Sequence, residues 1–162
     1  MHINGAEEEI LGKNSQQEAI KFWQQIEKEI GKEILGKEMC EYRSGYSDLE
    51  PRTWGLLYFT DSSLYFQTFP KKSFWSSLLG GSQNEYSGEV RRFQICWDSV
   101  KEIKLPSQKK SFLSKLLLPD YQVSIKFQQD GIDKILILLI YSHSTRENIV
   151  QCFQEYQHKN IL

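Results

Sequence analysis

One stretch of this sequence decides the fold: Gly55-Leu56-Leu57-Tyr58-Phe59-Thr60, the polar triplet Asp61-Ser62-Ser63, and then Leu64-Tyr65-Phe66. Both flanking runs are rich in aromatic and aliphatic residues, and aromatic residues favour β-strands. A short polar triplet between two such runs is typical of a tight hairpin turn. The stretch therefore predicts a β-hairpin, and this hairpin is the first clear one in a longer series of strands.

The rest of the chain extends this hairpin into an antiparallel sheet. Residues 121–127 alternate apolar and polar positions, whereas 134–141 are nearly all Ile and Leu, so we expect both faces of the latter to be covered. Consecutive strands with short turns favour an antiparallel meander, and bending it into a barrel avoids exposed edges. The predicted strands are 39–44, 53–59, 64–69, 90–96, 100–105, 121–127 and 134–141, with a bend at 97–99 and a turn at 129–131.

An amphipathic helix precedes the strands. Ser15 and Glu18 fit a capping box, which predicts that the helix begins there, and Gly31 or Gly36 would end it. Its single apolar stripe must be buried, either on the barrel or in a dimer contact. The stripe consists of Ala19, Phe22, Trp23, Ile26 and Ile30.

A second amphipathic helix is predicted at the C-terminus. Ser144 and Glu147 form another capping box just before it. A helix in this position can seal the open end of a small barrel. Its apolar stripe consists of Ile149, Val150, Phe153 and Tyr156, and the first three are expected to insert.

The composition favours one domain without a membrane span. The chain has 162 residues, of which 40% are hydrophobic and 13% aromatic, which is enough for one buried core. Its net charge of −1 gives no global field for nucleic acid, so we expect no nucleic-acid partner. The longest apolar run, 135–141, is too short to cross a bilayer. We expect a cytoplasmic protein, with peripheral membrane contact left open.

The sequence predicts neither an enzyme nor a metal site. The three cysteines, Cys40, Cys96 and Cys152, lie far apart without a CxxC pair, which argues against a zinc site or a disulfide framework. Cys96 and Cys152 are expected to be small core residues. No HExxH, GxSxG or GxGxxG motif occurs, and the histidines are scattered. We therefore expect no catalytic residues, no cofactor and no metal.

Two local patterns point to a known family. They are Gly55-x-Leu57-Tyr58-x-Thr60-x-x-x-Leu64-x-Phe66 and Phe93-x-Ile95-x-Trp97-x-x-Val100-x-x-Ile103. With the order of elements, they make residues 39–158 resemble the GRAM domain of the pleckstrin-homology (PH) superfamily. The first pattern resembles the family's hairpin, and the second its Trp-containing turn between two strands.

This resemblance implies a fold and a class of function. The implied fold is mainly β: a PH-like, strongly bent antiparallel barrel of seven strands, capped by a C-terminal helix. Residues 39–162 would form this domain, and residues 1–38 would be an N-terminal helical extension. The implied function is binding of phosphoinositides, other lipids or proteins, without catalysis. The resemblance assigns no binding residue, because 53–59 lack basic residues and only Arg43 and Arg52 lie nearby.

An internal near-repeat supplies the candidate binding residues. Residues 71–79 read KKSFWSSLL and residues 109–117 read KKSFLSKLL, with seven of nine positions identical. Apolar residues at i, i+1, i+4 and i+5 predict one or two one-sided helical turns after a pair of lysines. The candidates are Lys71, Lys72, Phe74 and Trp75 in the first segment, and Lys109, Lys110, Phe112, Leu113 and Lys115 in the second.

Two interpretations of these two basic-apolar segments remain open. In one, they enter an anionic membrane interface or a partner's groove, where each lysine near an anionic surface contributes about 1 kcal/mol. In the other, their apolar side chains fold back onto the barrel, since burying each is worth roughly 1.5–3 kcal/mol. The leading function is a binding module for an anionic membrane surface or lipid. The alternative is a protein-interaction or self-association adaptor, including a homodimer, that uses the N-terminal helix and these segments.

Overall fold

The computed structural model describes residues 5–69, 89–106 and 121–160, with side chains from residue 16 onward. The chain forms two compact units. One contains helix α1 (Gly5–Ile30), and the other, residues 34–69 and 90–162, contains the sheet and helix α4 (His143–Asn160).

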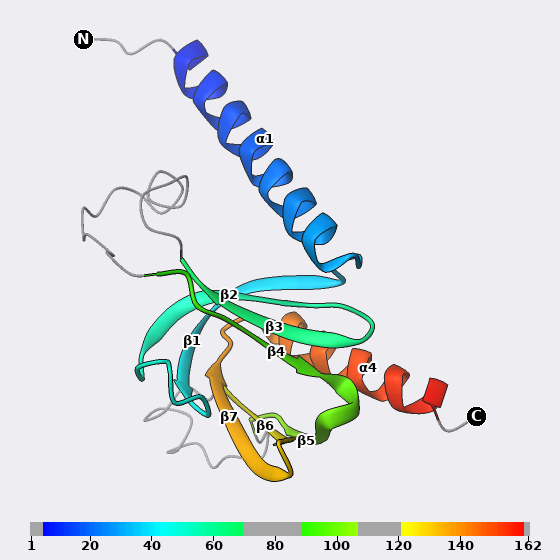
Figure 1. The fold of residues 1–162 in the computed structure, drawn as a ribbon. Helices are drawn as coiled ribbons and strands as arrows, with labels where there is room; N and C mark the ends of the chain where they lie inside the picture. The colour runs from blue at the N-terminus through cyan, green and yellow to red at the C-terminus, as the bar shows by residue number, and fades with distance from the viewer. Residues whose placement is uncertain (1–4, 70–88, 107–120, 161–162) are drawn as a thin grey trace, which may run out of the picture. The chain divides into compact units, whose positions relative to one another are not determined.

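The sheet has seven antiparallel strands in the order β4-β3-β2-β1-β7-β6-β5 (Figure 1). β4 and β5 form its two edges, and the short 3₁₀ helix η1 (Trp97–Ser99) connects them along the chain. The predicted fold class, mainly β with a C-terminal helix and an added N-terminal helix, is confirmed. The strands are β1 (Gly36–Ser44), β2 (Thr53–Phe59), β3 (Ser63–Thr68), β4 (Arg92–Cys96), β5 (Val100–Lys104), β6 (Gln122–Gln129) and β7 (Ile132–Leu139).

The core lies on the inner face of the bent sheet, and α4 packs against it. Ile149 and Phe153 of α4 are buried in this core, and the Phe153 ring lies 6.2 Å from that of Trp97. Tyr156 packs against the core from a half-buried position, whereas Val150 is half-buried and outside the core cluster. The expected plugging of the sheet by the last helix is confirmed, with Ile149 and Phe153 as its main contributors.

The two sequence patterns meet at the β2–β3 turn. The indole N–H of Trp97 donates to the Thr60 carbonyl at 3.0 Å, and its backbone N–H donates to the Ser62 carbonyl at 2.9 Å. Trp97 is almost fully buried, so both bonds lie at the end of the core. The Thr of the first pattern and the Trp of the second are therefore one structural unit, which fixes the hairpin turn to the η1 corner.

Glycine is required inside β2. A Cβ built on Gly55 would lie 2.5 Å from the carbonyl oxygen of Gln67 on β3 and 2.5 Å from the Phe66 ring. The predicted turn between β6 and β7 is also confirmed. Asp130 and Gly131 have φ of 53° and 75°, as a type I′ hairpin turn requires.

The start of α1 differs from the prediction, whereas its end agrees. The helix begins at Gly5 and not at Ser15, because the Ala- and Glu-rich residues 6–11 are good helix formers and continue it toward the N-terminus. It ends at Ile30, and Gly31 adopts φ of 67°. The Lys32 N–H donates to the Glu27 carbonyl, which completes a Schellman-type end. The predicted apolar stripe is buried or half-buried along its length.

The cap of α4 is also different. The helix begins at His143, and the Ser142 hydroxyl accepts a hydrogen bond from the Thr145 N–H at 3.3 Å. Ser142 is therefore the N-cap, and the predicted capping box at Ser144 and Glu147 is wrong by two residues. Glu147 instead lies 3.5 Å from His143.

The outer face of β7 also corrects the sequence analysis. Leu136, Leu138 and Ile140 are fully buried, but Ile135 is 52% exposed. The prediction that both faces of this strand are covered is therefore wrong for the outer face. An antiparallel sheet needs to bury only one face, so a continuous apolar run does not require two.

Candidate functional site

The nine binding residues predicted from the sequence all lie in 70–88 or 107–120, outside the described residues. The first basic-apolar segment belongs to the connection between β3 and β4, and the second to that between β5 and β6. Their exposure and their role in binding stay predictions. The structure describes the strands that these two segments connect.

The loop between β1 and β2 is held rigidly by two tyrosines. The Tyr42 hydroxyl donates to the Tyr46 carbonyl at 2.7 Å and accepts from the Tyr46 N–H at 2.7 Å. The Tyr46 ring stacks on Phe93 with centroids 4.0 Å apart and planes within 9°. Burial raises the pKa of Tyr46 to about 12, helped by the neighbouring Cys96 and Tyr42. The β1–β2 loop is thus packed against the core through Tyr46.

Basic side chains surround this loop. The Arg91 guanidinium donates to the Asp48 carbonyl, and the Lys134 ammonium lies 5.8 Å from the centre of the Tyr46 ring. Arg52 is exposed at the end of the loop, with φ of 67°. Two of the three cations therefore stabilise the loop itself, which leaves Arg52 as the more available one.

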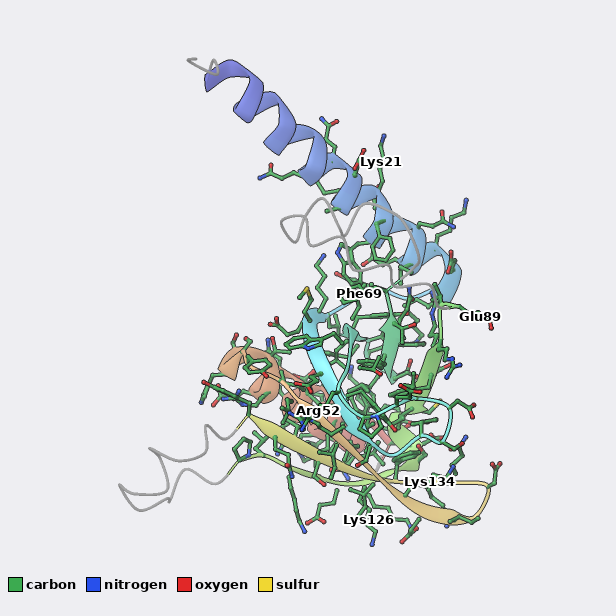
Figure 2. The ribbon with its side chains drawn as sticks, turned by 90° about the vertical axis from the view of Figure 1, so that its left-hand side faces the viewer. Lys21, Arg52, Phe69, Glu89, Lys126 and Lys134 are labelled. Atoms are coloured by element: carbon green, nitrogen blue, oxygen red, sulfur yellow. The ribbon has the colours of Figure 1, made fainter. Side chains whose placement is uncertain are left out.

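The outer face of β5, β6 and β7 carries lysines that are paired with acids. Lys101 and Lys126 both contact Asp133, at 2.6 and 3.3 Å, and Lys104 lies 3.2 Å from Glu102. The hydrogen bonds from Lys101 and then Lys126 lower the pKa of Asp133. Figure 2 shows Lys126 on the β6–β7 hairpin with Lys134 of the same hairpin. This face therefore presents mostly neutralised charge.

Four residues beside the end of β7 form a site that the sequence analysis missed. Trp54 stacks parallel to Tyr141, with centroids 5.7 Å apart and planes within 7°. The Tyr121 ring lies 4.7 Å from that of Tyr141, and the Arg146 guanidinium lies 5.8 Å from the Tyr121 ring. We call Trp54, Tyr121 and Tyr141 the aromatic cluster.

A signal for this cluster was present in the sequence. Tyr121 precedes one predicted strand and Tyr141 ends its hairpin partner, so the hairpin register brings them together. The observed ladder pairs Gln122 with Leu139 and continues with a hydrogen bond from the Ile140 N–H to the Tyr121 carbonyl. Trp54 joins them through β1, because Glu41 pairs with both Trp54 and Leu139. Placing Trp54 beside Tyr141 requires knowing that β1 lies between β2 and β7, and the periodicity of the sequence does not reveal this strand order.

The three cysteines, all among the described residues, differ in burial. No cluster of metal-ligating side chains occurs within 16–69, 89–106 and 121–160. Burial raises the pKa of the Cys40 thiol and, less strongly, that of Cys152, which keeps both protonated. Cys96 is exposed, so its predicted core position is wrong: it occupies the outward side of the edge strand β4. Over the part of the chain that is described, neither helix has the apolar length needed to cross a bilayer.

Comparisons with known proteins add a likeness to solved structures at low sequence identity. No protein-family model matches the chain, and no curated protein matches it. One similar solved structure is the crystal structure of the DH/PH domains of p115-RhoGEF, at 13% identity and a TM-score of 0.44. The match covers 77% of this chain and 30% of that chain. The description of the fold therefore rests on this chain's own strand order and helix packing.

Proposed function

We propose that this chain is a non-catalytic binding module of the PH/GRAM type, which attaches to an anionic membrane surface through its two basic-apolar segments. The family assignment is supported by the contact between the two sequence patterns, where Trp97 bonds to the Thr60 and Ser62 carbonyls. In this proposal the seven-stranded sheet is a rigid base, and the segments in its β3–β4 and β5–β6 connections make the contact.

The observation that carries the proposal is the state of the lysines on the sheet. All four lysines of β5, β6 and β7 already have partners: Lys101 and Lys126 on Asp133, Lys104 on Glu102, and Lys134 on Gln129. Acids therefore partly neutralise three of these lysines, whereas Lys134 keeps its charge beside the uncharged Gln129 amide. The five lysines of the basic-apolar segments come as clusters in the sequence and are accompanied by aromatic residues, as interfacial anchors require.

The proposed membrane contact should contribute several kcal/mol and should depend on salt. Five lysines at about 1 kcal/mol each would give several kcal/mol, and the inserted aromatic residues would add to this. The electrostatic part should weaken strongly at high salt, because the Debye length falls from about 14 Å at 50 mM to about 4 Å at 500 mM.

The test is co-sedimentation with phosphatidylcholine vesicles, with and without about 30% phosphatidylserine, at low and at high salt. We expect binding only to the anionic vesicles at low salt, and a loss of about tenfold or more for Lys109→Ala with Lys110→Ala. Trp75→Ala should weaken binding at low salt and leave its salt dependence unchanged, because its contribution is apolar. The matched control is Lys104→Ala with Lys126→Ala, which changes the net charge equally and should bind as the parent does. Absence of binding to anionic vesicles at low salt would refute the proposal.

A further inference from the structure

The aromatic cluster is exposed although its rings pack on one another. Trp54 is 38% exposed and Tyr141 is 43% exposed. Arg146 contacts two parts of the cluster. Its guanidinium donates hydrogen bonds to the Ile140 and Tyr141 carbonyls and lies over the Tyr121 ring. The rings are therefore fixed in place before any ligand arrives, so that binding would cost little side-chain entropy.

An apolar row on β7 continues the cluster along the sheet. Ile135, Ile137 and Leu139 occupy outward positions that alternate with the buried Leu136 and Leu138. Ile135 is exposed, and the other two outward residues are half-buried. Outward positions of an antiparallel sheet are usually polar where solvent covers them. The row and the cluster lie on one face of the sheet and together form a strip, with the buried Glu41, which is paired with Arg43, between Trp54 and Leu139. Exposed apolar surface of this kind marks binding sites.

Other outward apolar residues of the same sheet are covered. Leu56 and Tyr58 of β2 and Tyr65 of β3 are all buried, and the two tyrosine rings stack at 5.1 Å. The strip on β7 thus differs from the rest of the outer face. The rings of Trp54 and Tyr141 remain accessible in the folded chain.

The charges beside the strip favour an uncharged ligand. Lys101 and Lys126 share Asp133, Lys104 is paired with Glu102, and Arg43 lies 3.3 Å from Glu41, so the four cations and three acids nearly cancel. An anionic membrane would gain little here, because the summed charge of these groups is small. An apolar ligand without charge fits the strip better.

The cluster also carries hydrogen-bond donors that point to a backbone ligand. The Trp54 indole N–H and the Tyr141 hydroxyl have no hydrogen-bond partner among residues 16–69, 89–106 and 121–160. An extended segment in the polyproline II conformation has no internal hydrogen bonds, so its carbonyls are free to accept. Such a segment also binds with a low entropy cost, and it docks on grooves lined by aromatic rings.

We propose that the aromatic cluster and the outer row of β7 bind an uncharged, proline-rich segment of a partner protein in the polyproline II conformation. Proline rings would stack on Trp54 and Tyr141, and the two free donors would bind backbone carbonyls. Apolar residues further along the segment would lie on Ile135 and Ile137. The residues of this surface differ from those of the two basic-apolar segments, and the inference does not depend on membrane binding.

The test uses the full chain and a panel of synthetic uncharged peptides that contain Pro-x-x-Pro. Each has a matched peptide in which alanine replaces the prolines. Binding is followed by the indole N–H resonances of the ¹⁵N-labelled protein, with Trp54→Phe used to assign the signal. We expect at least one proline peptide to shift the Trp54 signal and not that of the buried Trp97. The alanine peptides should bind at least about tenfold more weakly.

Variants distinguish this docking from general adhesion. Trp54→Ala and Tyr141→Ala should each weaken peptide binding by about tenfold, as central aromatic contacts do. The matched control is Val90→Ala, an apolar residue that is similarly exposed outside the strip. The inference is overturned if no peptide moves the Trp54 resonance, or if alanine peptides bind equally well. A Trp54 shift produced by anionic vesicles and by no peptide would also overturn it, in favour of a lipid contact.

Discussion

At the scale of single residues, the packing positions were predictable, and the solvent-facing ones were less so. Trp97 and Gly55 carry the two sequence patterns, and the structure gives each a physical role: a donor to the turn carbonyls and a close approach of strands. Such roles leave a signal because few residues can replace them. The prediction for Cys96 relied on its residue type, whereas the alternation of Phe93, Ile95 and Trp97 already puts position 96 on the outward side, where the structure places it.

Gly55 provides a first prediction. We expect Gly55→Ala to lower the free energy of unfolding by about 1–3 kcal/mol, because the new methyl group would press on the Gln67 carbonyl oxygen, which is backbone and cannot turn away. Urea denaturation measures this, with Gln122→Ala, at an exposed strand position, as the control. A Gly55→Ala protein as stable as the parent would mean that the two strands separate easily at this point.

Tyr46 provides a prediction about pH. Its folded-state pKa of about 12 lies above the ordinary value of 10, so the native state retains a proton that the unfolded chain releases. The stabilisation is complete below pH 10 and is lost as the pH rises toward 12. Urea unfolding at pH 9 to 11.5 should show this fall, and Tyr46→Phe should make it shallower. The bonds to Tyr42 use the backbone of Tyr46 and are retained. The buried Cys40 thiol should leave a residual fall of the same sign. Identical slopes for the two proteins would contradict the assignment.

At the scale of elements, the sequence predicted which helices and strands occur better than it predicted the residues at which they begin and end. All seven strands and both helices occur, and β2 has the predicted bounds, because periodicity and turn residues are local signals. The N-terminal ends of the helices were wrong, since Ser142 and Ser144 are both competent caps and only the entry of the chain into α4 decides between them. The exposed outer row of β7 was missed for a similar reason: the run of apolar residues is the same for one covered face or two.

The cap of α4 gives a direct test at this scale. Ser142→Ala should lower stability by about 1 kcal/mol, because the Thr145 N–H loses its acceptor at the start of the helix. Ser144→Ala should cost clearly less, since its hydroxyl contacts only the Ser142 hydroxyl at 3.0 Å. Thermal or urea unfolding of the two variants side by side measures the difference. The reverse order of stability would restore the capping box read from the sequence.

At the scale of the whole molecule, the two proposed binding regions differ in chemistry, and the chain joins both of them to one sheet. The basic-apolar segments were found from the sequence because a near-repeat is visible without a structure. The aromatic cluster was not, because its three rings come from β2 and from both ends of the β6–β7 hairpin, and only the strand order joins them. In this chain, a candidate site within one segment can be predicted from the sequence, whereas a candidate site assembled from several strands cannot.

The different chemistry of the two proposed binding regions leads to a prediction of independence. Lys109→Ala with Lys110→Ala should reduce binding to anionic vesicles and leave proline-peptide binding unchanged. Trp54→Ala with Tyr141→Ala should do the opposite, and the four-fold variant should show both losses with additive free energies, as two independent sites require. Salt should separate them as well: vesicle binding should weaken steeply at high salt, whereas docking on a strip whose lysines are already paired should change little. If the aromatic variants also abolished vesicle binding while the protein stayed folded, the aromatic cluster would belong to the membrane contact. The two proposed sites would then be one site.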